Sequence, residues 1–195
     1  MAKQVIGIGA AANDGTGDPL RDAFDKTNDN FTELYEKKYG FLDYNDTATA
    51  TTPLVVTGGG GFTYLTNDGL GAFTNKTYPP QGVTDVWDAG NSRFHFNQLV
   101  LGSKMDYRLD ISITTASANQ EVDVAIELAI GGSAYSLSVA QRFYKSAGTY
   151  PLVLSNFIYM GDTNTMNNYG KFKIQSPSNA TVIVNGWACS IHLYL

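Results

Sequence analysis

The feature that most constrains this chain is the alternation of apolar and polar side chains after about residue 80. In the runs YRLDISIT (107–114) and VDVAIELAI (122–130), apolar residues recur at every second position. Successive side chains of a β-strand point to opposite faces, so this spacing predicts strands with one buried face. Turn residues such as Gly131-Gly132 separate the runs. Several closely spaced strands of this kind predict an antiparallel β-sandwich over residues 81–195.

Composition excludes several classes of partner. The formal net charge is −5 and the pI is about 4.8. A nucleic acid or an anionic membrane would require a basic surface, so neither is expected as a partner. The single cysteine, Cys189, rules out an intrachain disulfide framework and a cysteine metal cluster.

A helix is expected near the N-terminus. Asp18 is predicted to cap its first turn, Pro19 suits the first helical position, and Gly40 is expected to end it, with Lys37 and Lys38 in its last turn. The larger side chains fall at spacings of four and three: Leu20, Phe24, Thr27, Phe31 and Leu34. This heptad pattern fits either a coiled coil of three copies or a single helix docked on a neighbouring protein.

The same stretch carries a resemblance. Residues 13–35, NDGTGDPLRDAFDKTNDNFTELY, resemble a segment that recurs near the N-terminus of fibres, whiskers and other appendages of tailed bacteriophages. The matching positions are Asn13, Asp14, Gly15, Thr16, Gly17, Asp18, Leu20, Arg21, Ala23, Phe24, Asn28, Asn30, Phe31, Leu34 and Tyr35. The resemblance implies a structural part of a phage virion. Residues 1–38 would then contact another virion protein or further copies, through Asp18, Leu20, Phe24, Phe31, Leu34 and Tyr35.

The later strands resemble the jelly roll of the tumour-necrosis-factor and complement-C1q class. An early aromatic strand holds Phe94 and Phe96, and the pairs Lys171-Phe172 and Gly186-Trp187 precede an apolar terminal run. In that class three jelly rolls pack around a threefold axis and bury aromatic residues between subunits. The resemblance therefore implies a homotrimer.

Three regions follow from these patterns. Residues 1–40 form an arm and a helix for attachment or oligomerisation, and residues 81–195 form the jelly roll. The polar run DYNDTATATT (43–52) and the four glycines at 58–61 predict that residues 41–80 are a Thr/Gly-rich connector with one or two short strands.

No catalytic constellation is recognisable. His95 and His192 stand far apart in the sequence and neither is spaced to a nucleophile or to further metal ligands. Residues 7–12 fit a loose dinucleotide pattern, but the helix expected from Pro19 starts too late to face a pyrophosphate. We therefore expect no enzyme activity, no cofactor and no bound metal.

Two hypotheses of function remain. The first is a virion structural component, a short trimeric fibre or capsid decoration of head, neck or tail. The second is a tip that binds a host receptor or glycan, with candidate residues Tyr159, Asn164, Asn167 and Tyr169. No signal peptide or membrane anchor is recognisable, so assembly into the virion within the host cytoplasm is expected.

Overall fold

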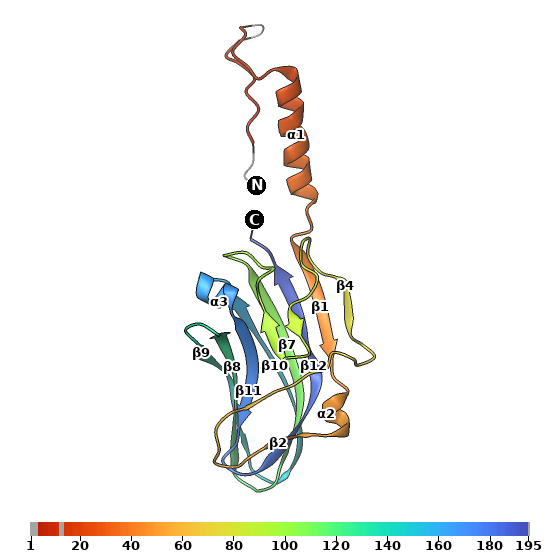
Figure 1. The fold of residues 1–195 in the computed structure, drawn as a ribbon, viewed down its shortest axis with the longest axis vertical. Helices are drawn as coiled ribbons and strands as arrows, with labels where there is room; N and C mark the ends of the chain where they lie inside the picture. The colour runs from red at the N-terminus through yellow and green to blue at the C-terminus, as the bar shows by residue number, and fades with distance from the viewer. Residues whose placement is uncertain (1–3, 12–13, 195) are drawn as a thin grey trace. The chain divides into compact units, whose positions relative to one another are not determined.

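The structure, a computed structural model, describes residues 4–11 and 14–194, without the side chains of Leu34 and Tyr35. The chain folds into two compact units, of which the first ends at Lys37 and the second spans Lys38–Tyr194. Figure 1 shows a long helix in the first unit and two facing sheets in the second.

The first unit consists of an extended arm and the helix α1 (Leu20–Tyr35). Within this unit the arm, residues 4–11, folds back alongside α1 (Figure 1). Pro19 directly precedes the helix, where its missing N–H leaves no intrahelical bond unmade.

The helix ends earlier than predicted. Glu36 is already extended, so Lys37 and Lys38 lie beyond the last turn, which holds no basic residue. Gly40 is a strand residue of the second unit and does not end the helix. A Cβ atom on Gly40 would clash with the backbone of Tyr78 and Pro80, so the glycine permits a close approach of two backbones.

The second unit contains two antiparallel sheets. Sheet A has the spatial order β10 (Gly148–Tyr159), β7 (Lys104–Thr115), β12 (Ala180–His192), β1 (Tyr39–Asn45) and β4 (Asn75–Tyr78), with β2 (Leu54–Val56) also on β12. Sheet B has the order β5 (Trp87–Asp88), β6 (Arg93–His95), β11 (Tyr169–Gln175), β8 (Gln120–Ile130) and β9 (Tyr135–Tyr144), with β3 (Thr63–Tyr64) also on β11. Two short helices, α2 (Ala48–Thr51) and α3 (Thr163–Asn167), complete it.

The strand pairing defines a jelly roll. Among β1 and β6 to β12, the first strand pairs with the last and the second with the next to last. The third strand pairs with the sixth and the fourth with the fifth, and these nested pairs alternate between the two sheets. A long antiparallel hairpin rolled into two sheets is a jelly roll. The predicted fold class, an N-terminal arm and helix followed by an antiparallel β-sandwich, is confirmed.

The core lies between the sheets, where the predicted alternation places it. In β7, Leu109, Ile111 and Ile113 are fully buried, and the residues between them point to the opposite face of the sheet. An aromatic cluster joins the two sheets. The ring centre of Trp187 on β12 lies 4.4 Å from the ring centre of Trp87 and 5.4 Å from that of Phe172, both on sheet B. This cluster fixes the two sheets face to face.

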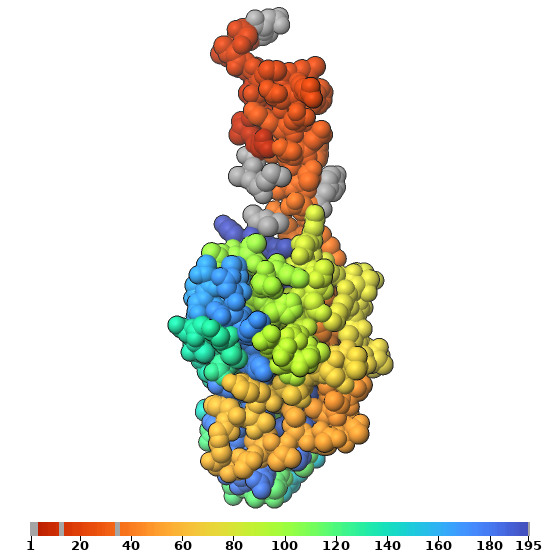
Figure 2. Space-filling view, in the orientation of Figure 1, coloured from red at the N-terminus to blue at the C-terminus, as the bar shows by residue number. Residues whose placement is uncertain are grey.

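Residues 41–80 differ from the predicted connector. Strand β1 pairs with β12 over its whole length, and Leu42 and Tyr44 are fully buried in the core. The polar run that follows is also anchored, because the Thr49 hydroxyl accepts a hydrogen bond from the buried Val184 N–H at 2.8 Å. Figure 2 shows this orange-to-yellow segment spread over the surface of the second unit. The region that starts at Lys38 therefore belongs to the jelly-roll unit, and its polar side chains serve backbone hydrogen bonds.

Candidate functional site

Asp18 ties the arm to the helix and does not cap it. Its Oδ2 accepts a hydrogen bond from the Gly7 N–H at 2.7 Å and from Lys26 Nζ at 2.6 Å. The Asp18 N–H donates in return to the Gly7 carbonyl oxygen at 2.8 Å. These bonds, led by the one from Lys26, hold the pKa of Asp18 below its usual value. The predicted N-cap role is wrong, since no side chain caps the first turn of α1.

Asn30 hydrogen-bonds the backbone at the start of the arm, with one acceptor and one donor, as a neighbouring β-strand would. Its Oδ1 accepts from the Gln4 N–H at 2.8 Å and its Nδ2 donates to the Gln4 carbonyl oxygen at 2.9 Å. The Gln4 side chain donates to Asp29 Oδ2 at 2.7 Å. One side-chain amide of the helix thus satisfies both backbone groups of an arm residue.

The turn between arm and helix is organised by Asp14. Its carboxylate accepts hydrogen bonds from the N–H groups of Ala10, Ala11 and Thr16, at 2.6, 2.7 and 2.9 Å. These bonds, led by the one from Thr16, lower the pKa of Asp14 to about 2. A Cβ atom on Gly17 would lie 2.9 Å from the Gly7 carbonyl oxygen, so only glycine admits the arm here.

The helix keeps an exposed apolar stripe, formed by Leu20, Phe24 and Phe31. These side chains are 74%, 59% and 51% exposed. The arm is bonded to Asp18, Lys26 and Asn30, and the three apolar side chains stay at least half exposed. The predicted docking residues Leu34 and Tyr35 lie on the same helix, but their side chains are outside the described part. We call Leu20, Phe24 and Phe31 the helix stripe.

Replacing Asn30 with alanine should release the start of the arm. Two hydrogen bonds to Gln4 are lost, and each is worth about 1 kcal/mol, so the Gln4 amide hydrogen should exchange roughly tenfold faster or more. Hydrogen exchange followed by NMR measures this, with Asn28→Ala as the matched control, since Asn28 is exposed on the same helix. Unchanged exchange at Gln4 in Asn30→Ala would show that Asn30 does not hold the arm.

The second candidate surface is the outer face of sheet A. It carries exposed aromatic side chains on its two sides: Tyr39, Phe41 and Tyr78 on β1 and β4, and Phe157 and Tyr159 on β10. The register places Phe41 opposite Ser190, Ser190 opposite Asp106, and Asp106 opposite Phe157. Phe41 and Phe157 therefore face each other across one row of the sheet, three strand spacings or about 14 Å apart.

Between these aromatics lies a groove of about 510 Å³, with Phe41 and Phe157 on its sides and Arg108, Ala188 and Ser190 along its floor. We call it the aromatic groove. The middle of the same face is charged: Lys104 Nζ lies 2.8 Å from Asp106 Oδ1, and His192 Nε2 lies 3.4 Å from Asp106 Oδ2. Exposed apolar side chains gathered on one face in this way mark a surface that another protein can cover.

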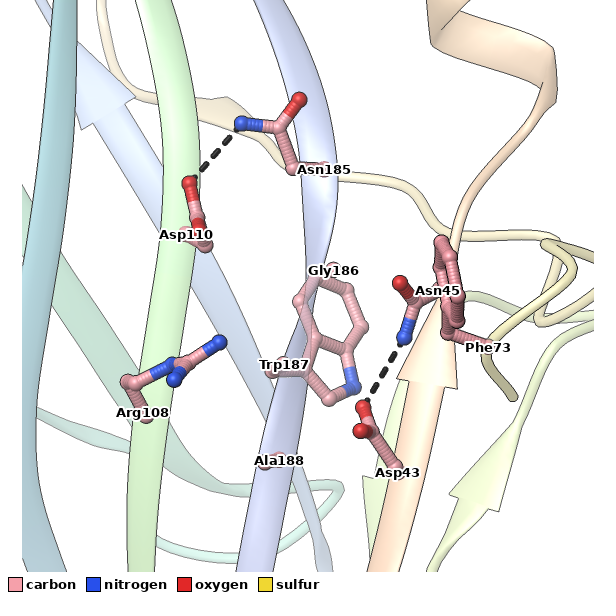
Figure 3. A pocket seen from close by; sticks show the side chains of 9 residues that line it. All are labelled: Asp43, Asn45, Phe73, Arg108, Asp110, Asn185, Gly186, Trp187 and Ala188. Carbon is pink, nitrogen blue, oxygen red and sulfur yellow. Dashed lines mark hydrogen bonds between the residues drawn. The ribbon is translucent and has the colours of Figure 1, made fainter. Parts of the chain in front are cut away.

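A smaller polar pocket of about 210 Å³ adjoins the groove and shares Arg108 and Ala188 with it. Figure 3 shows its hydrogen bonds, from Asn185 Nδ2 to Asp110 Oδ1 at 2.8 Å and from Asn45 Nδ2 to Asp43 Oδ1 at 2.9 Å. Burial raises the pKa of Asp43, although the nearby Arg108 cation opposes the shift. These polar groups largely satisfy one another.

The four residues predicted to bind a ligand lie near α3, but they have different contacts and do not form one site. The Asn164 side chain bonds the backbone of Ser133 through both its oxygen and its nitrogen, at 3.1 Å each. Tyr169 pairs within sheet B, and the Arg93 guanidinium lies 3.5 Å from the centre of its ring. Asn167 is exposed on α3. Tyr159 lines a cavity between β9 and β10, which sequence reasoning did not find.

Within residues 4–11 and 14–194, no three His, Cys, Asp or Glu side chains gather closely enough to hold a metal ion. No helix in the described part of the chain has the length and apolar character needed to cross a lipid bilayer.

Comparisons with known proteins find structures but no relatives in sequence. No protein-family model and no curated protein matches this chain. The Eiger TNF structure from S. frugiperda matches over 82% of this chain and 94% of its own, with 8% identity and a TM-score of 0.41. The PRD1 vertex protein P5 matches over 80% and 73%, with 15% identity and a TM-score of 0.36.

The structure of infectious bursal disease virus Gx strain matches over 48% of this chain, with 8% identity and a TM-score of 0.35. This chain spans only 24% of that one. TM-scores this low carry no argument, and the assignment to the jelly-roll class rests on the nested strand pairing. The described residues thus define a jelly-roll domain preceded by a separate arm-and-helix unit.

Proposed function

We propose that this protein is a structural component of a bacteriophage virion, in which the arm-and-helix unit attaches to another virion protein and the jelly roll forms a projecting head. One observation carries the proposal. Within the phage-like segment, Asp14, Asp18 and Asn30 hold the arm in place, while Leu20, Phe24 and Phe31 remain exposed. The segment therefore builds a unit that offers an apolar surface to a partner.

The chemistry of the helix suggests what the partner surface is like. An amphipathic helix docks by laying its apolar stripe into a groove. The sides of α1 are mainly acidic: Asp22, Asp25, Asp29 and Glu33, against Arg21 and Lys26. The partner is then an apolar groove with a basic or polar rim on the particle.

We further infer that three copies associate through the outer face of sheet A. The aromatic groove and the exposed rings beside it supply apolar area to bury, and the resemblance to the tumour-necrosis-factor class motivates the threefold arrangement. Attachment by the first unit and trimerisation by the second would together give a short fibre or a capsid decoration. The role is structural and not catalytic, and its place is the virion, assembled in the host cytoplasm.

The trimer can be tested by solution mass. The full chain should have three times its 21.1 kDa mass in light scattering, and Phe41→Ser should shift it to the monomer. Phe41 is 51% exposed on the groove, so the substitution removes apolar contact area without disturbing the core. The control is Leu70→Ser, an exposed apolar residue in the loop between β3 and β4, which should remain trimeric. A monomeric wild-type chain would contradict the trimer.

Attachment can be tested with particles assembled without this protein. Purified protein should sediment with such particles through a density gradient and saturate at a fixed number of copies. Protein that stays at the top of the gradient at every concentration would contradict the proposed role. A receptor- or glycan-binding head remains the second candidate, and the cavity between β9 and β10 is the observation that favours it.

A further inference from the structure

A cavity of about 450 Å³ opens between the two sheets, at the edge where β9 and β10 meet. Both are the end strands of their sheets, and the chain passes from one to the other through residues 145–147. The volume lies within the range of about 300–1,000 Å³ that small-molecule sites occupy. It is separate from the helix stripe and from the polar pocket of sheet A, and it shares Tyr107, Asn156 and Phe157 with the aromatic groove.

The mouth of the cavity is aromatic. Tyr135 on β9 and Tyr159, the last residue of β10, line it and are 38% and 61% exposed. The ring of Phe157 lies instead on the outer face of sheet A, where Lys104 Nζ is 5.2 Å from its centre. The faces of aromatic rings carry partial negative charge, and they attract the slightly positive C–H groups of a sugar ring. Flat apolar faces at the mouth suit a ring-shaped ligand.

The floor of the cavity offers a hydroxyl that the protein does not use. Tyr107 on β7 is only 3% exposed and lines the cavity, yet its hydroxyl bonds to no residue in the described part of the chain. It is also not among the buried polar atoms that are sealed from solvent, in contrast to Trp187 Nε1. A buried tyrosine hydroxyl usually has a partner, as that of Tyr44 does in Asp85 at 2.6 Å. The Tyr107 hydroxyl is therefore available to a molecule in the cavity.

The polar part of the rim is held in place by its own hydrogen bonds. The Asp162 Oδ1 accepts from the Thr165 N–H at 2.7 Å, and the hydroxyls of Thr165 and Tyr135 lie 2.9 Å apart. Ser138 and Asn156 add a hydroxyl and an amide to the lining. Fixed donors and acceptors of this kind select hydroxyl groups at little entropic cost.

Charge narrows the ligand class. Among the described residues that line the cavity, Asp162 alone is charged, and no Lys, Arg or His is present. The bond from the Thr165 backbone holds the pKa of Asp162 below its usual value, so it is an anion at neutral pH. An anionic ligand would meet a negative charge without a compensating cation.

We propose that this cavity binds an uncharged pyranose ring, as carried by a neutral glycan. The ring stacks on the aromatic mouth, and one of its hydroxyls bonds Tyr107. This inference stands on the cavity and is independent of attachment to a virion.

The test is a titration of the full chain followed by saturation-transfer NMR. The probes are the methyl α-glycosides of glucose, galactose, mannose, N-acetylglucosamine and N-acetylgalactosamine, with the methyl glycoside of sialic acid as the anionic probe. At least one neutral glycoside should bind saturably in the millimolar range, and the sialoside should not bind.

Two variants locate the binding. Tyr107→Phe should weaken it roughly three- to tenfold, because it removes one hydrogen bond to the ligand and none within the protein. Tyr159→Ala should abolish the signal, and the control Tyr194→Phe, which removes an exposed hydroxyl outside the cavity, should leave it unchanged. An unchanged unfolding midpoint in each variant ensures that the fold is intact.

Three results would overturn the proposal. The first is that no glycoside of the panel binds saturably, and the second is that the sialoside binds more strongly than any neutral glycoside. The third is that a neutral glycoside binds but neither Tyr107→Phe nor Tyr159→Ala changes its affinity. Because each is read on soluble protein without particles, none of them bears on the virion role.

Discussion

Replacing Phe24 and Phe31 together with aspartate is expected to abolish uptake of the protein by particles, with an apparent affinity at least about 100-fold lower. Burying one phenylalanine side chain contributes about 1.5–3 kcal/mol, and each 1.4 kcal/mol is a factor of ten. The two side chains are 59% and 51% exposed, so slightly more than half of that contribution is still available to a partner. Two carboxylates placed in an apolar groove add a desolvation cost.

The same particle-sedimentation assay measures this effect, and a matched variant controls for charge. Arg21→Gln with Thr32→Asp also changes the net charge by −2, at exposed positions on α1 away from the helix stripe. It should sediment with particles as the wild type does. The thermal midpoint of the jelly roll should stay the same in both variants, because the helix belongs to a separate compact unit. Full uptake of the Phe24/Phe31 variant would show that the helix stripe is not the attachment surface.

Replacing Trp187 with alanine is expected to lower the free energy of unfolding of the jelly roll by about 3–5 kcal/mol. Trp187 is 1% exposed, and its ring contacts Trp87 and Phe172 across the two sheets. The loss removes the transfer free energy of the largest buried side chain and leaves a cavity at the join of the sheets. Urea unfolding followed by circular dichroism measures it.

Two further variants sharpen this prediction. Trp187→Phe should cost clearly less than alanine, because the buried Trp187 Nε1–H has no hydrogen-bond partner among the described residues and phenylalanine removes that donor. Phe73→Ala, at a side chain that is 80% exposed, should change stability by less than about 0.5 kcal/mol. Equal losses for Trp187→Ala and Phe73→Ala would mean that the aromatic cluster does not join the sheets.

The sequence predicts the long strands well because their signal is local. β7 alternates over its whole length and β8 over its first half, and one buried face is enough to specify each strand. Strand β1 lacks that signal, since it is a short strand that contains Gly40 and continues into a polar run. Its place in the sheet depends on β12, which lies more than a hundred residues later in the chain. A pairing of this range leaves no trace in a local pattern.

The arm-and-helix unit illustrates the same limit for a single side chain. An aspartate before Pro19 fits the pattern of a helix cap, and the local sequence offers no competing partner for it. The structure supplies one in the Gly7 N–H, brought back by the turn at Asp14. The exposed stripe, in contrast, was predictable, because its spacing of four and seven follows from helix geometry alone.

The cavity was predictable only in part. The aromatic and polar residues before and in α3 drew attention to Tyr159, and the structure places that residue at the mouth. Tyr107 and Tyr135 lie on other strands, and only the packing of sheet A against sheet B brings them to the same cavity. The useful sequence signal was a tyrosine at an inward-pointing position of β7, where its hydroxyl needs a partner.

A structural component of a virion is present at a fixed copy number, which can be measured in purified particles. Quantitative mass spectrometry of particles banded twice in a density gradient gives that number relative to the major capsid protein. We expect a fixed stoichiometry, a multiple of three at each attachment site, that survives repeated banding. Absence of the chain from such particles, or an amount that falls with each gradient, would contradict it.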